Sequence, residues 1–100
     1  MVFSIHDPTE VAIQKMIEAS QQILKVNTQG KGMNPAVKKH YELQIKTLQN
    51  APRDAEELEW LLKKKERAKE EAMHIEDTQR LVTEIEMLRI VLRLVRRERK

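Results

Sequence analysis

The chain has 100 residues, enough for one domain, and only 3% of them are aromatic, so its core must be built from aliphatic side chains. Charged residues make up 35% of the sequence, the formal net charge is +3, and there are only two glycines and three prolines; this composition predicts an all-helical protein. The absence of cysteine excludes disulfide frameworks, thiolate zinc sites and cysteine nucleophiles.

The first predicted helix spans residues 8–26 and opens with a clear start signal. Asp7 supplies a capping carboxylate, Pro8 suits the first helical position, and Glu10 completes a capping box. Apolar residues then recur at three- and four-residue spacing, with polar residues between them. One stripe of this helix is therefore expected to face a core.

The second predicted helix spans residues 35–50. Both glycines of the chain, Gly30 and Gly32, lie in the connection before it, and Asn34 followed by Pro35 repeats the signal of a cap and then a proline. We expect the first two helices to form a helical hairpin. The apolar stripe of the second helix consists of Val37, Tyr41, Ile45 and Leu48.

The third predicted helix is long and spans residues 54–99. Asp54 and Glu57 form a capping box at its start, and no glycine or proline follows. The heptad pattern of apolar residues shifts by one position near Asp77. Two interpretations remain open. The absence of a helix breaker favours one continuous helix with a local change of winding, whereas a separate helix capped by Asp77 would give a four-helix bundle.

The end of this long helix carries more apolar surface than the two shorter helices are expected to reach. At about 1.5 Å per residue, it would extend about 70 Å, against about 30 Å and about 24 Å for the others. The hairpin should then pack on its first half and leave a coiled-coil-like self-association segment at residues 78–96. So broad an apolar arc predicts a homo-oligomer, a dimer first, or a complex with another helical protein. The predicted oligomer interface is Leu81, Ile85, Leu88, Val91, Leu92 and Val95.

No set of residues in the sequence points to catalysis. Glu71 and His74 have the Glu-x-x-His spacing of di-metal bundles, but the chain has no second copy of this motif. The stretch at residues 30–32 lacks the preceding strand and the Ser or Thr of a phosphate-binding loop. We therefore expect no enzymatic activity, no metal, no cofactor and no small-molecule substrate.

The alternative function is nucleic-acid binding by a regulatory dimer. From Leu88 onward, six basic residues accompany a single acid, Glu98. Such a basic tip would contact phosphates without reading sequence, although cations in the last turns of a helix also complement its dipole. The candidate phosphate-binding residues are Arg89, Arg93, Arg96, Arg97, Arg99 and Lys100.

The ends of the chain bear on its location. Residues 1–5 are too short and too mixed for a secretory signal, and Arg89 and Arg93 interrupt the C-terminal apolar run, which argues against a membrane span. Arginines opposite leucine and valine are also a surface-helix pattern, so binding to a membrane surface is a less favoured interpretation. We expect an intracellular, cytoplasmic, single-domain protein that acts as a non-enzymatic interaction module, an adaptor or scaffold.

Overall fold

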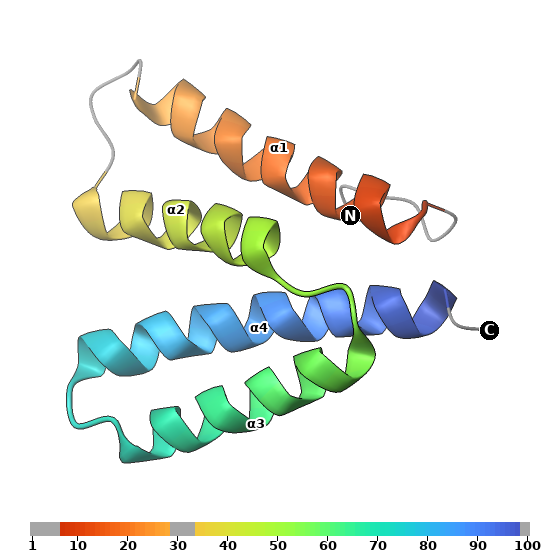
Figure 1. Cartoon of the computed structure of the whole chain (residues 1–100). Coiled ribbons are helices and arrows are strands. Elements are labelled where there is room, and N and C mark those ends of the chain that lie inside the picture. Colours follow the sequence, from red (N-terminus) through yellow and green to blue (C-terminus); the bar gives the residue numbers. More distant parts are fainter. Residues whose placement is uncertain (1–6, 29–33, 99–100) are drawn as a thin grey trace.

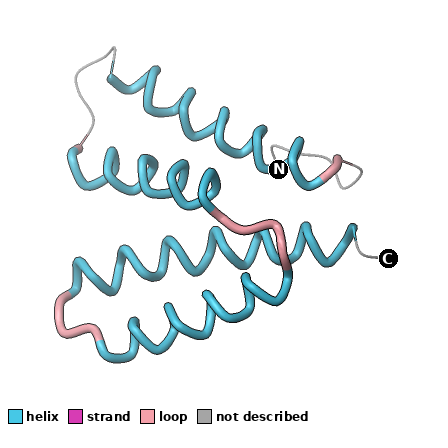
Figure 2. The backbone as a smooth tube through the Cα atoms, in the orientation of Figure 1, coloured by secondary structure: helices cyan, strands magenta, loops and turns pink. Residues whose placement is uncertain are grey.

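The computed structural model describes residues 7–28 and 34–98 and arranges them as four helices joined by short connections (Figure 1). Within these residues the backbone forms helices and connections but no strand (Figure 2). The predicted all-helical fold class is therefore confirmed. The helices are α1 (Thr9–Thr28), α2 (Pro35–Asn50), α3 (Ala55–Glu71) and α4 (Ile75–Glu98).

Local capping signals explain where α2 and α3 begin. The Asn34 side chain accepts a hydrogen bond of 2.9 Å from the backbone N–H of Ala36, and Pro35 follows in the first turn. The Asp54 carboxylate accepts one of 3.4 Å from the backbone N–H of Glu57. Both contacts satisfy N–H groups that have no partner within their helix. The predicted glycine-containing connection at residues 29–33 lies outside the described residues.

The favoured prediction of a continuous helix over residues 54–99 is wrong, and the described chain has the four helices of the alternative with a break near Asp77. The first of two separate helices, α3, ends at Glu71, and Ala72 leaves the helix with extended backbone, φ −65° and ψ 130°. The chain then reverses, and α4 begins at Ile75, so Asp77 lies in its first turn instead of capping it. The break needs no glycine or proline, because folding back allows the apolar stripe of α4 to pack on that of α3.

α4 is the central helix of the fold. It packs against α1, α2 and α3, whereas in the described part of the chain α3 packs against α4 alone and α1 against α2 and α4. The principal extents are 46 × 37 × 18 Å, so the molecule is flat. Figure 1 shows the four helices diverging from one end of the molecule toward the other.

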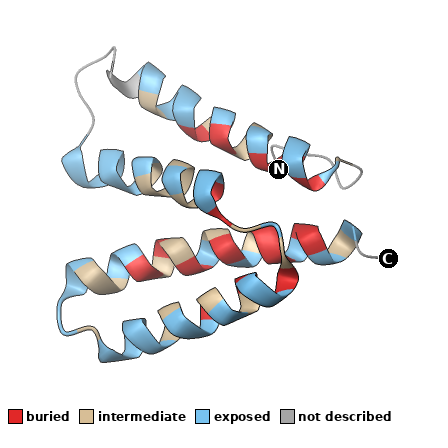
Figure 3. Ribbon diagram, viewed as in Figure 1, coloured by how far each residue is buried: buried red, intermediate tan, exposed pale blue. Residues whose placement is uncertain are grey.

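The two ends of this fan differ in burial. We call the end where α1 and α3 begin and α2 and α4 finish the closed end, and the opposite end the open end. Figure 3 shows buried residues concentrated toward the closed end. There the core joins residues of all four helices and of the α2–α3 connection; they are Ala12, Ile13, Ile17, Leu48, Ala51, Ala55, Leu58, Leu62, Ile85, Leu88, Val91, Leu92, Leu94 and Val95.

The residues predicted as an oligomer interface are buried within the single chain. The exposed fractions of Leu81, Ile85, Leu88, Val91, Leu92 and Val95 lie between 0% and 8%. Their apolar arc is wide because α4 is covered by three neighbouring helices, which requires apolar side chains around most of its circumference. This burial overturns the prediction that a partner must cover them.

Candidate functional site

The open end carries most of the large apolar side chains that the chain leaves uncovered. Among the described residues, seven large apolar side chains are exposed, and only Val11 and Trp60 lie away from this end. Met73 and Ile75, in and just after the α3–α4 turn, are 93% and 75% exposed. Uncovered apolar side chains gathered in one region indicate an interaction site. The five at the open end are Ile23, Val26, Val37, Met73 and Ile75.

A groove separates the first halves of α2 and α4 at the open end. Its volume is about 900 Å³, and its walls include Pro35 and Leu43 on α2 and Val82 on α4. This volume lies within the range of about 300–1,000 Å³ found for binding pockets. The groove forms because α2 and α4, which lie side by side, separate toward their first residues (Figure 1).

A chain of hydrogen bonds joins the two walls of the groove. The amide nitrogen of Gln44 lies 3.0 Å from Nε2 of His40, and Nδ1 of His40 lies 3.2 Å from the hydroxyl of Thr83 on α4. An amide nitrogen can only donate, so Nε2 accepts and the neutral ring carries its proton on Nδ1. The Thr83 hydroxyl in turn donates to the carbonyl of Gln79, and Ser20 on α1 donates to the Gln44 amide oxygen at 3.3 Å.

No local sequence pattern indicates this polar network. His40 lies beside Tyr41 at an exposed position of α2, and consecutive residues of a helix point in different directions, so the sequence around it does not identify its partners. The network joins α1, α2 and α4, and the placement of α4 depends on the reversal after Ala72, close to the break near Asp77 that the sequence left as an alternative. The network ties α1, α2 and α4 together and limits how far the open end can spread.

The walls of the groove carry opposite net charges, with Arg80 the one basic residue that α4 adds to the described lining. Lys39 lines it on α2, and Glu76 and Glu86 line it on α4. Within the described residues these three side chains form no ion pair, whereas Asp77, also on this wall, pairs with Arg80 at 3.4 Å. The open end therefore offers unpaired cationic and anionic groups next to uncovered apolar ones.

The basic residues predicted to bind phosphate serve partly as internal contacts. Arg89 pairs with Glu66 at 2.6 Å, and Arg96 pairs with Glu59. Two arginines of α4 therefore form ion pairs with two glutamates of α3. Seven residues separate the partners on each helix, which is the repeat expected of two antiparallel helices packed along one seam.

The two other basic residues of the tip that the structure describes, Arg93 and Arg97, have different surroundings. Arg97 donates to the backbone carbonyl of Asp7, at the start of α1, and Arg93 is exposed. Arg99 and Lys100 lie outside the described residues. Because Arg89, Arg96 and Arg97 hold α3 and α1 against α4, this geometry gives limited support to phosphate binding.

Other kinds of site receive no support from the geometry. His74 and Glu71 are both exposed, and no cluster of three or more His, Asp or Glu side chains suited to a metal ion occurs in residues 7–28 and 34–98. None of the described helices combines the length and apolar content needed to cross a membrane. Compared with protein-family models, with curated proteins and with solved structures, the chain matches none of them. Function is therefore inferred from the surfaces of this chain.

Proposed function

We propose that the protein is a non-enzymatic helical interaction module that forms a homodimer through its open end. The observation that carries this proposal is that five of the seven exposed large apolar side chains described lie at the open end, where the groove between α2 and α4 also opens. The C-terminal seam named from the sequence is replaced by this surface, because that seam is already covered within the chain.

The charges of the groove favour a second copy as the occupant. In a dimer with twofold symmetry the same surface is used twice, so a residue on one wall meets the other wall of its partner. Lys39 on α2 of each copy is then placed to meet Glu76 or Glu86 on α4 of the other. A surface with cations on one side and anions on the other is complementary to itself.

The available apolar surface predicts a reversible dimer. Fully burying one side chain of this size contributes about 1.5–3 kcal/mol. Association costs about 4–15 kcal/mol in lost translational and rotational freedom, which is of the same order as the gain from a handful of such side chains, so the dimer should dissociate on dilution. The monomer keeps its own core in either state.

Sedimentation of the full chain from low to high micromolar concentration tests the proposal. The mass should rise from 11.8 kDa toward twice that value as the concentration increases. Val37→Asp should prevent this rise, because it places a carboxylate in the apolar part of the interface.

Val11→Asp is a matched control. Val11 is 41% exposed and Val37 is 42% exposed, but Val11 lies near the start of α1, at the closed end. The Val11→Asp variant should therefore dimerise like the unmodified chain and be as soluble as the Val37→Asp variant. A chain that stays monomeric at every concentration contradicts the proposal, and so does equal behaviour of the two variants.

A further inference from the structure

A second cavity lies between α2 and α3, with α4 as its floor. In the described part of the chain α2 and α3 flank α4 without packing against each other. The resulting α2–α3 cleft has a volume of about 460 Å³, which also falls in the range of about 300–1,000 Å³ typical of ligand sites. Its apolar lining includes the buried Leu81 and Leu88 of α4 and the half-buried Leu43 and Leu61 on either side.

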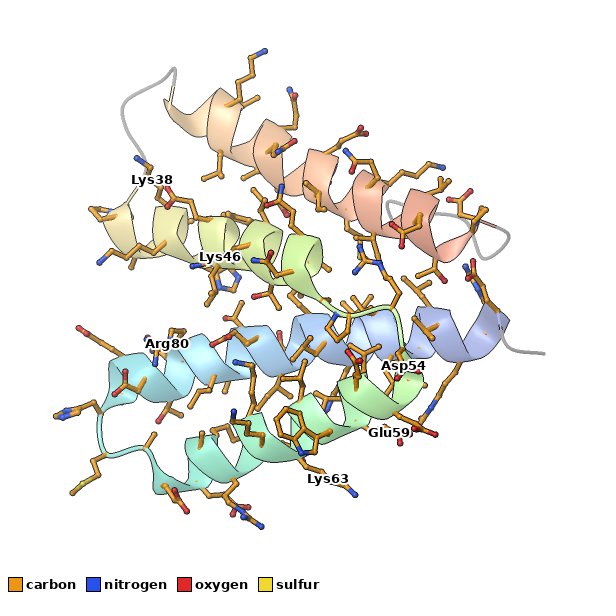
Figure 4. All side chains as sticks on the ribbon, viewed as in Figure 1. Lys38, Lys46, Asp54, Glu59, Lys63 and Arg80 are labelled. Carbon is orange, nitrogen blue, oxygen red and sulfur yellow. The ribbon has the colours of Figure 1, made fainter. Side chains whose placement is uncertain are left out.

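Cations from three helices converge on this apolar floor. Lys46 comes from α2, Lys65 from α3 and Arg80 from α4, and the acid that lines the cleft is Glu84. Figure 4 shows Lys46 and Arg80 on helices that face each other across the gap between α2 and α4. The lining therefore has a formal surplus of two positive charges.

The ion pairs of Glu84 do not account for all of this charge. Lys65 Nζ lies 2.7 Å from one carboxylate oxygen, and Arg80 Nε lies 3.9 Å from the other. The Glu84 side chain is 17% exposed, so the nearby cations compensate its partial burial. One cation suffices for that purpose. Lys46 forms no ion pair within the described residues, and Arg80, although it also contacts Asp77, remains 59% exposed.

We infer that the α2–α3 cleft binds a small organic anion, a carboxylate or sulfonate attached to an apolar body. The apolar body would lie on the leucine floor, where its burial is favourable. The anionic group would take charge-assisted hydrogen bonds from Lys46 and Arg80 at the rim. The cleft is formed within one chain, but Leu43 and Arg80 also line the groove of the proposed dimer, so the test below measures binding and dimerisation separately.

Binding of naphthalene-2-sulfonate to the full chain tests this inference. Calorimetry should show saturable binding at one site per chain, and amide resonances of residues that line the cleft should shift in nuclear magnetic resonance spectra. Naphthalene-2-methanol, which has the same ring system but no charge, should bind about tenfold more weakly, because it lacks the charge-assisted contacts.

Two lysine variants locate the site. Lys46→Met keeps the aliphatic part of the side chain and removes its charge, so it should weaken binding of the sulfonate about tenfold. Lys63→Met removes an exposed lysine of α3 that does not line the cleft, and it should leave binding unchanged. Equal effects of the two variants would overturn the inference, as would absence of saturable binding or equal affinity for the uncharged compound.

The same titration separates this inference from the proposed dimer. Val37→Asp, which is expected to be monomeric, should bind naphthalene-2-sulfonate as the unmodified chain does, because Val37 does not line the cleft. Loss of the dimer with retained binding supports the two proposals separately. Loss of binding in this variant, with its helicity intact, would show that the probe occupies the open end instead.

Discussion

Glu98, the last residue of α4, accepts a hydrogen bond from the backbone N–H of Thr9, the first residue of α1. The Thr9 hydroxyl donates to the carbonyl of Leu94 at 3.2 Å, and Lys15 pairs with Asp7 at 2.9 Å. A carboxylate at a helix N-terminus satisfies an otherwise unpaired N–H and complements the helix dipole. These contacts fasten the two ends of the described chain to each other at the closed end.

The pKa of Glu98 depends on this contact. The hydrogen bond from the Thr9 backbone lowers the pKa of Glu98 below its ordinary value of 4.5, and the charge of Arg97 acts in the same direction. A carboxyl group whose pKa is lower in the folded chain than in the unfolded chain stabilises the fold at pH values above its ordinary pKa. That contribution is lost as the pH falls through the pKa of the folded state.

Glu98→Gln should therefore lower the free energy of unfolding at pH 7 and have a smaller effect at strongly acidic pH. Urea denaturation measures the free energy of unfolding at pH 7 and at strongly acidic pH. Glu70→Gln, at an exposed position of α3 away from the closed end, is the control and should change neither value appreciably. A constant difference between Glu98→Gln and the unmodified chain at all pH values would contradict the assigned hydrogen bond.

At the scale of the helix, α4 is stabilised by neighbours within its own chain. Leu88 is 2% exposed and belongs to the core, so Leu88→Ala should lower the free energy of unfolding by about 2–5 kcal/mol through the cavity it leaves. Urea denaturation should give the same loss at low and high protein concentration, because the contacts are intramolecular. A loss that grows with protein concentration would place Leu88 between copies.

Short-range signals predicted the helices well where a cap or a proline was present. Asn34 and Asp54 start α2 and α3 as expected, because each capping contact involves residues two or three positions apart. The end of α3 has no such signal. The chain leaves the helix at Ala72 because packing of α4 on α3 outweighs the helix propensity of the intervening residues.

The favoured interpretation of a continuous helix, in place of the alternative with a break near Asp77, explains why the candidate site was placed on α4. From the sequence, the arc from Leu81 to Val95 looks too wide for the available neighbours, but a central helix contacted by three others requires such an arc. Val37 was assigned to a core stripe and is 42% exposed, because α1 and α2 diverge toward the open end. The groove and the α2–α3 cleft join residues far apart in sequence, so no local pattern could predict them.

At the scale of the whole molecule, the fan has a core at one end and uncovered apolar side chains at the other. Its radius of gyration of 14.6 Å exceeds the value of about 13 Å expected for a compact chain of this length. A flat, diverging arrangement of helices leaves surface that a compact bundle would bury. A second copy at the open end would cover part of that surface and leave the closed end unchanged.

Hydrogen exchange of backbone amides, measured at low and at high protein concentration, tests this division of the molecule most directly. Amides of residues 85–95 should already be strongly protected at the lower concentration, because their core is complete within one chain. Amides in the first halves of α2 and α4 should gain protection as the concentration rises. The opposite pattern, with concentration-dependent protection of residues 85–95 and an unchanged open end, would contradict the account.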